Sequence, residues 1–173
     1  MPAGLWLRLK AFAADYLLIF GYLLLVIVVS VFLIPSLQGL FQASPGTAQQ
    51  TGFLLVTLPV SLYFVVVDSR LGRQSFGKRK IHIRVVDENH QAISVYRAIV
   101  RTALKFLPWE LSHFMAYRMI YLGDGAVQVM DYMIGGLIYA LIFLYILMAL
   151  FTKNKQSLYD RITKTYVVKS NFS

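Results

Sequence analysis

Cysteine is absent from this chain of 173 residues, and acidic residues are scarce. Without cysteine the chain can form no disulfide, no thiolate nucleophile and no cysteine-ligated metal site. Charged residues make up 14% of the sequence and hydrophobic residues 58%, whereas soluble domains carry about 25% charged residues. These proportions argue against a soluble domain and indicate an integral membrane protein.

The common enzyme motifs are also missing. The sequence contains no HExxH zinc motif, no GxSxG nucleophile elbow, no Walker loop and no GxGxxG dinucleotide motif. We therefore leave enzymatic activity undecided and favour a protein that is not an enzyme. We predict no cofactor, other than a bound cation as an open alternative.

Long apolar stretches predict one membrane domain over residues 1–173, an all-α bundle of about four transmembrane helices with a small cytoplasmic β-hairpin. The expected spans are 11–34, 52–67, 106–122 and 134–151, long enough at about 1.5 Å per helical residue to approach or exceed the bilayer core. Residues 106–122 are the most polar of the four, and a re-entrant segment there is the alternative.

The distribution of charge predicts the topology. The chain has 17 Lys and Arg against 8 Asp and Glu, a net charge of +9. With four spans, sixteen basic residues lie inside and only Arg118 outside, as the positive-inside rule requires. Both termini are then cytoplasmic, and nucleic acid is not needed as a partner to explain the excess of positive charge.

The charged segment 70–105 is expected to hold the hairpin and a basic helix. Apolar residues alternate with polar ones from Ile81 to Val85, a turn follows at residues 87–90, and residues 91–95 are expected to return as the second strand. Arg97, Arg101 and Lys105 then recur every four residues on one helical face. This stripe predicts contact with anionic lipid at the cytoplasmic face, or a docking surface for a protein partner. No internal repeat is evident.

Ionisable residues inside the expected spans are the candidates for function. Asp15 lies in the first span, where an unpaired carboxylate costs several kcal/mol. Glu110 and His113 are three residues apart and share a helical face. Asp15 and Glu110 could lie at one depth and bind a proton or a cation. Glu110 and His113 are also weak candidates for a metal site, and a structural polar cluster is the alternative.

Three ordered motifs resemble the bacterial RDD family, which is named for one arginine and two aspartates. Arg8 and Asp15 in LRLKAFAADYLL match the first pair, residues 75–101 match the central Gly-Lys segment, and residues 153–168 match the block that holds the second aspartate, Asp160. The chain departs from the family pattern at His82, His90, Tyr159 and residues 163–164. The resemblance implies a multi-pass protein of the bacterial cytoplasmic (inner) membrane.

Three functions remain open. The first is a small cation/proton exchanger or transport component that uses Asp15 and Glu110; the resemblance supports it, since some family members have been linked to sodium–proton exchange. Four spans are few for alternating access, so an exchanger would need a homo-oligomer. The second is a regulatory or scaffolding protein that docks a partner through its basic face, and the third is an intramembrane metal-dependent enzyme. In each case we expect Arg8 to contact Asp160, Asp15 or both.

Overall fold

Long helices form a bundle in the structure, a computed structural model that describes residues 1–170. The last three residues of the expected domain therefore lie outside the described part. The first helix, α1 (Leu5–Val28), continues through the π-helical turn η1 (Val29–Leu33). Two short helices, α2 (Ser36–Ala43) and α3 (Pro45–Gly52), follow, and α3 runs through η2 (Phe53–Thr57) into α4 (Leu58–Asp68).

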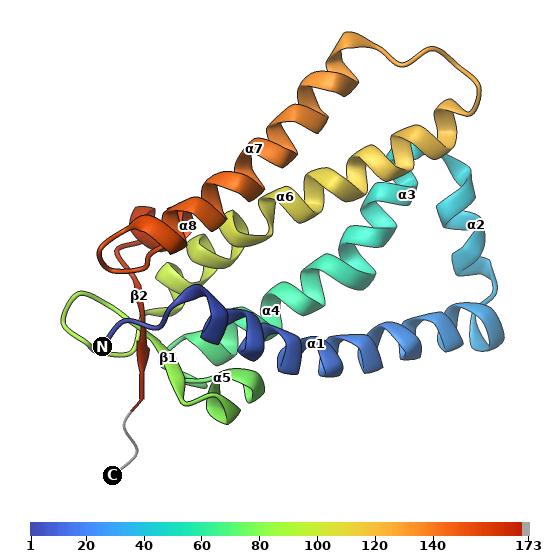
Figure 1. Cartoon of the computed structure of the whole chain (residues 1–173). Helices are drawn as coiled ribbons and strands as arrows, with labels where there is room; N and C mark the ends of the chain where they lie inside the picture. Colours follow the sequence, from blue (N-terminus) through green and yellow to red (C-terminus); the bar gives the residue numbers. More distant parts are fainter. Residues whose placement is uncertain (171–173) are drawn as a thin grey trace.

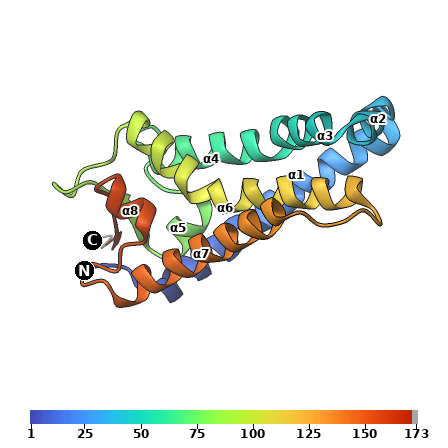
Figure 2. The same cartoon turned by 90° about the horizontal axis from the view of Figure 1, so that it is seen from above.

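The second half of the bundle consists of α6 (Val95–Leu122) and α7 (Val129–Phe151). Both views show α6 beside α7, and α4 runs along α6 (Figures 1 and 2). The connections of the bundle at one end are α2 and the loop between α6 and α7. The other end holds the N-terminus, the one-turn helices α5 (Phe76–Lys80) and α8 (Leu158–Ile162), and the strands β1 (Ile83–Val86) and β2 (Tyr166–Lys169). We call it the cap end.

Three stretches of the described chain are long and apolar enough to span a membrane: Leu5–Leu33, Pro45–Asp68 and Val129–Phe151. Each begins several residues before the bound expected from the sequence, most clearly the second, which begins at residue 45 and not at residue 52. The polar helix α6 is not among the three. It merges the expected basic helix and residues 106–122 into one helix, about 42 Å long at 1.5 Å per residue.

The expected hairpin is wrong. Strand β1 (Ile83–Val86) forms where alternation predicted it, but its antiparallel partner is β2 (Tyr166–Lys169) near the other end of the sequence. Residues 87–92 form a turn, and Ile93 makes only an isolated parallel bridge with Ser69. Alternating hydrophobicity identifies a strand without identifying its partner, and the nearest candidate along the chain is not the one used.

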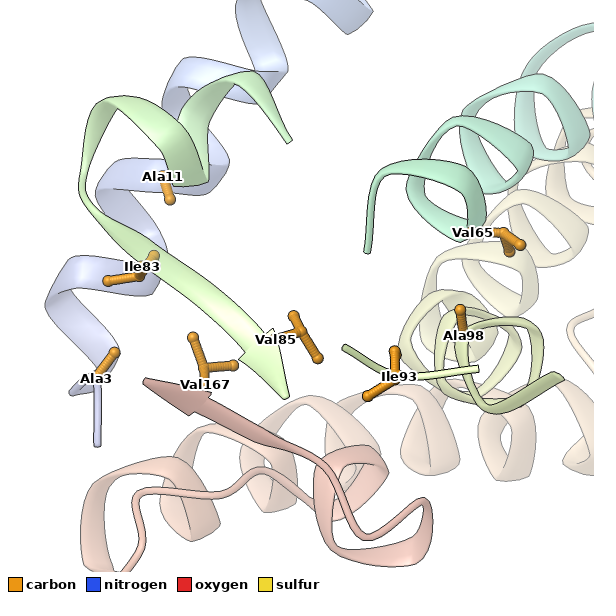
Figure 3. Close-up of a cluster of buried hydrophobic side chains, with 8 residues drawn as sticks. All are labelled: Ala3, Ala11, Val65, Ile83, Val85, Ile93, Ala98 and Val167. Carbon is orange, nitrogen blue, oxygen red and sulfur yellow. The ribbon is translucent and has the colours of Figure 1, made fainter. Parts of the chain in front are cut away.

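A small apolar core holds the cap end together (Figure 3). Ile83 and Val85 of β1 and Val167 of β2 are almost fully buried between side chains of three long helices. The helices contribute small residues, among them Ala11 from α1 and Ala98 from α6. Small side chains let the two-stranded sheet lie close to the helices, and this shared core supports a sheet that would be marginal alone.

The cap end also contains a repeat that the sequence analysis missed. Short helices α5 (Phe76–Lys80) and α8 (Leu158–Ile162) each begin after a serine, Ser75 or Ser157, and each precedes a strand. A shift of 82 residues superposes 73–86 on 155–168, and we call these segments the first and second cap copies. Only five of the fourteen paired residues are identical, which explains why the repeat escaped notice.

The backbone of the two cap copies agrees in detail. Positive φ angles occur at Arg73 and Lys155 (66° and 53°) and again at His82 and Lys164 (55° and 51°). Gln74 donates to the carbonyl of Ile83, and its counterpart Gln156 donates to the carbonyl of Thr165. The strands pair with Val85 opposite Val167, which are equivalent residues. Each copy follows two long helical stretches, so the fold consists of two similar halves.

Candidate functional site

Asp15 ties α1 to the first cap copy. Its buried carboxylate accepts hydrogen bonds from the backbone N–H of Gly77 at 2.7 Å, the hydroxyl of Ser75 at 2.5 Å and the hydroxyl of Tyr63 at 3.2 Å. A Cβ on Gly77 would lie 1.9 Å from the carbonyl oxygen of Ala11, so only glycine allows α5 to approach α1 this closely. These contacts assign Asp15 a structural role.

Five charged side chains form a buried network beside Asp15. Arg101 lies at its centre, 3.0 Å from Asp68 and 2.9 Å from Asp160. Lys78 forms an ion pair with the other oxygen of Asp68, and Arg8 with the other oxygen of Asp160. Because α1, α4, α6 and both cap copies each contribute a member, the network fastens the two halves of the fold together.

Asp160 is the carboxylate that gathers the most partners. It accepts from Arg8 and Arg101, and it closes a capping box with Ser157 at the start of α8. Burial alone would raise the pKa of Asp160, but the charges of Arg101 and Arg8 outweigh it and hold the pKa below its ordinary value. The carboxylate is therefore ionised at neutral pH.

Arg8 contacts Asp160, one of the two partners that the sequence predicted, and its second terminal nitrogen donates to the carbonyl of Lys155 at 2.6 Å. Asp15, the other expected partner, has no ion pair with Arg8 in the described structure. The three motif residues Arg8, Asp15 and Asp160 therefore form two separate contacts: Arg8 pairs with Asp160, and Asp15 binds the backbone of Gly77.

The expected basic stripe does not form a single surface. Arg101 is 3% exposed and belongs to the network, whereas Arg97 forms an exposed pair with Glu88. Lys105 is half-buried, and its ammonium lies 3.9 Å from the ring centre of Phe64 and 5.0 Å from that of Phe106. Spacing placed the three residues on one helical face correctly, but α4 and the second cap copy cover part of that face.

Lys105 differs from its neighbours because it lacks an acidic partner. Its ammonium makes no hydrogen bond or ion pair with residues 1–170, and aromatic rings surround it. A cavity of about 400 Å³ between α1, α6 and α7 is lined by Lys105, by many apolar side chains and, toward the cap end, by members of the charged network and by Asp15.

A second polar cluster lies further along the bundle, between α3–η2 and α6. Glu110 accepts from the amide of Gln49 and, at 2.6 Å, from the hydroxyl of Thr57. His113 lies 3.8 Å from the same carboxylate. Two buried atoms of this cluster, Oε1 of Gln49 and Nδ1 of His113, have no hydrogen-bond partner in the described chain.

Asp15 and Glu110 do not meet at one site. Tyr63 contacts Asp15 and Thr57 contacts Glu110, and these two residues are six positions apart along the same helical stretch, about 9 Å at 1.5 Å per residue. Within the described residues no three His, Asp or Glu side chains gather closely enough to hold a metal ion. The Glu110–His113 pair therefore lacks a third protein ligand of that kind.

Sequence reasoning missed several members of these clusters. Asp68, Lys78, Gln49 and Thr57 were not among the candidate residues predicted from the sequence. Asp68 ends a long apolar stretch, and a carboxylate at that position signals an arginine or lysine partner. Arg118, at the opposite end of α6, forms an ion pair with Asp131 at the start of α7.

The comparisons with known proteins agree with the membrane architecture. The model of the RDD family matches residues 2–164, nearly the whole chain, and the chain therefore belongs to the RDD family. A comparison with curated proteins found no match, and neither did a comparison with solved structures.

Proposed function

We propose that this RDD-family membrane protein exchanges a monovalent cation for a proton at the cluster formed by Glu110, His113, Gln49 and Thr57. One observation carries the proposal: two buried polar atoms, on Gln49 and His113, lack partners beside a carboxylate. Burying a polar atom without a hydrogen bond costs about 1–3 kcal/mol, so such atoms favour a bound species that satisfies them.

The ligand types suit this exchange. The carboxylate of Glu110, the free carbonyl oxygen of Gln49 and the hydroxyl of Thr57 are hard oxygen ligands of the kind that alkali cations prefer. A proton could instead occupy the carboxylate or the imidazole of His113. Competition between a proton and a cation for one carboxylate is the elementary step of an exchanger, and Glu110 is better placed for it than Asp15, whose oxygens are held by three donors.

The proposal includes a topology. In it, α6 crosses the membrane with the three apolar stretches, because Arg118 pairs with Asp131 and Glu110 is satisfied by neighbouring helices. The cap end, with both termini, faces the cytoplasm of a bacterial cell, in keeping with its basic residues. A second copy of the chain would provide the additional helices that alternating access requires.

The test follows proton movement with a pH-sensitive dye in everted membrane vesicles, on addition of Na⁺, Li⁺ or K⁺. We expect a cation-dependent signal in the wild type and its loss in Glu110→Gln, which keeps the shape of the side chain but cannot titrate. Glu88→Gln is the matched control, because Glu88 is exposed and paired only at the surface. No signal in the wild type, or an equal signal in Glu110→Gln, would contradict the proposal.

A further inference from the structure

The cavity beside Lys105 lies next to a group of buried charges that is not electrically balanced, and the proposed exchange site does not use this group. Four cationic side chains meet three carboxylates at the cap end of the bundle, so the group carries one excess positive charge. The cations are Arg8, Lys78, Arg101 and Lys105, and the carboxylates are Asp15, Asp68 and Asp160. Every cation except Lys105 has a carboxylate within ion-pair distance.

The excess charge faces a space that could hold a ligand. Lys105 lines the cavity of about 400 Å³, a volume within the range of small-molecule sites. Aromatic rings of Phe12, Phe64 and Phe106 hold the ammonium in place by cation–π contact. Asp15 also lines the cavity, but its oxygens are held by Tyr63, Ser75 and Gly77. An incoming anion would therefore meet a preorganised positive charge that forms no ion pair in the described chain.

The side chains at the opening of the cavity indicate whether a ligand enters from water or from the lipid bilayer. Five of its lining side chains are also exposed, and all five are apolar or aromatic: Leu9, Phe12, Trp109, Ile142 and Ile146. They belong to α1, α6 and α7, and α1 and α7 are candidate membrane spans. A soluble anion would have to cross this apolar rim, whereas a lipid reaches it from within the bilayer.

We infer that this cavity binds an anionic phospholipid of the cytoplasmic leaflet, with its phosphate at Lys105 and its acyl chains between α1 and α7. The occupant combines the two properties that the cavity combines, a charge complementary to Lys105 and an apolar body. This site is separate from the Glu110 cluster and does not depend on ion exchange.

The experiment uses Trp109, which lines the cavity, as its reporter. The chain has two tryptophans, so Trp6→Phe leaves Trp109 alone. The purified full-length chain in detergent is titrated with brominated phosphatidylglycerol or brominated phosphatidylcholine, and quenching of fluorescence is measured. We expect half-maximal quenching at about a fivefold lower fraction of phosphatidylglycerol, the effect of one lysine near an anionic lipid.

Lys105→Met should remove this preference, and Lys105→Arg should retain it. Methionine keeps the packing against the rings and removes a charge without a carboxylate partner, so this variant should fold, as circular dichroism would verify. Lys153→Met is the matched control, because Lys153 is an exposed cation at the same end of the bundle. A preference that survives Lys105→Met, or that Lys153→Met abolishes equally, would overturn the inference. Displacement of the lipid by inorganic phosphate would also overturn it, in favour of a site for a soluble anion.

Discussion

The two cap copies share a backbone and differ in how each gathers its charges. Both contain a serine cap, one helical turn, two residues with positive φ and a strand. At the third helical position the first copy has Lys78 and the second has Asp160. A negative charge is favoured at a helix N-terminus, and a lysine there is not. The second copy therefore supplies its own anion, whereas the first needs one from elsewhere.

Asp15 of α1 supplies that anion. Its carboxylate accepts from Ser75 and Gly77 at the start of α5, as Asp160 accepts from Ser157 at the start of α8. The second helical position also differs between the copies: it holds Gly77 in the first and Tyr159 in the second. Gly77 lets α1 approach, while its counterpart Tyr159 is large and stacks beneath the guanidinium of Arg101. The first copy thus packs closely against α1, and the second copy binds the cationic side chains Arg8 and Arg101.

The sharpest test of this comparison is Gly77→Ala. The new Cβ would collide with the backbone of Ala11, which cannot turn aside as a side chain could. We expect the free energy of unfolding to fall by about 3 kcal/mol or more, measured from thermal melting in detergent. Gly135→Ala in α7 is the control: nothing lies within 4 Å of its added Cβ, so it should be neutral or mildly stabilising. Equal melting of Gly77→Ala and the wild type would show that α1 does not dock on the first copy.

A smaller loss in the free energy of unfolding is expected when the ion pairs that join the two cap copies through Arg101 are removed. Arg101→Met leaves Asp68 and Asp160 each with one cation fewer, and breaking a buried ion pair costs about 3–5 kcal/mol; the remaining partners, Lys78 and Arg8, should keep the loss near the lower end. Arg97→Met, one turn earlier on the same helix, removes an exposed pair worth about 0–1 kcal/mol. The measurement is the difference in melting temperature between the two variants. Equal values would mean that the network does not fasten the halves.

The smallest effect should come from relieving one of the positive φ angles in the cap copies. Lys164 has a φ of 51°, which glycine adopts without the cost paid by other residues. Lys164→Gly should raise the free energy of unfolding by up to about 1 kcal/mol, whereas Lys164→Ala should not. Chemical denaturation of both variants would detect the difference. A stabilisation by alanine equal to that by glycine would indicate that the charge, and not the backbone, is responsible.

The membrane class of the protein and its three apolar helices could be predicted from the sequence, because apolar length is a local signal. The sequence also predicted that Arg8 would contact Asp160, Asp15 or both, since a charge at that depth requires a partner, but it did not decide between the two. The partner of β1 could not, since any alternating strand can pair with it. The role of Arg101 was also hidden: a spacing of four residues reveals a shared helical face but not the carboxylates that cover it. The repeat was hidden because it is carried by backbone angles and five identities.

The departures from the family pattern at His82 and at residues 163–164 illustrate the same limit. The sequence marked them as residues where small or flexible ones are expected. His82 and Lys164 have positive φ at the same place in both cap copies. The departures at His82 and Lys164 therefore fall at the same position of the two cap copies, which only the three-dimensional structure reveals. His90 also has positive φ, at 59°, in the turn after β1.

The pairing of β1 with β2 sets an order of events during synthesis. Arg8 emerges from the ribosome 152 residues before Asp160, and β1 emerges long before Tyr166 begins its partner strand. Until then the edge of β1 is open and the guanidinium of Arg8 lacks its carboxylate. For most of the time the chain takes to be made, the nascent cap end therefore lacks its second copy. A stalled or truncated chain would expose an unpaired strand and an uncompensated charge, features of a substrate for quality-control proteolysis.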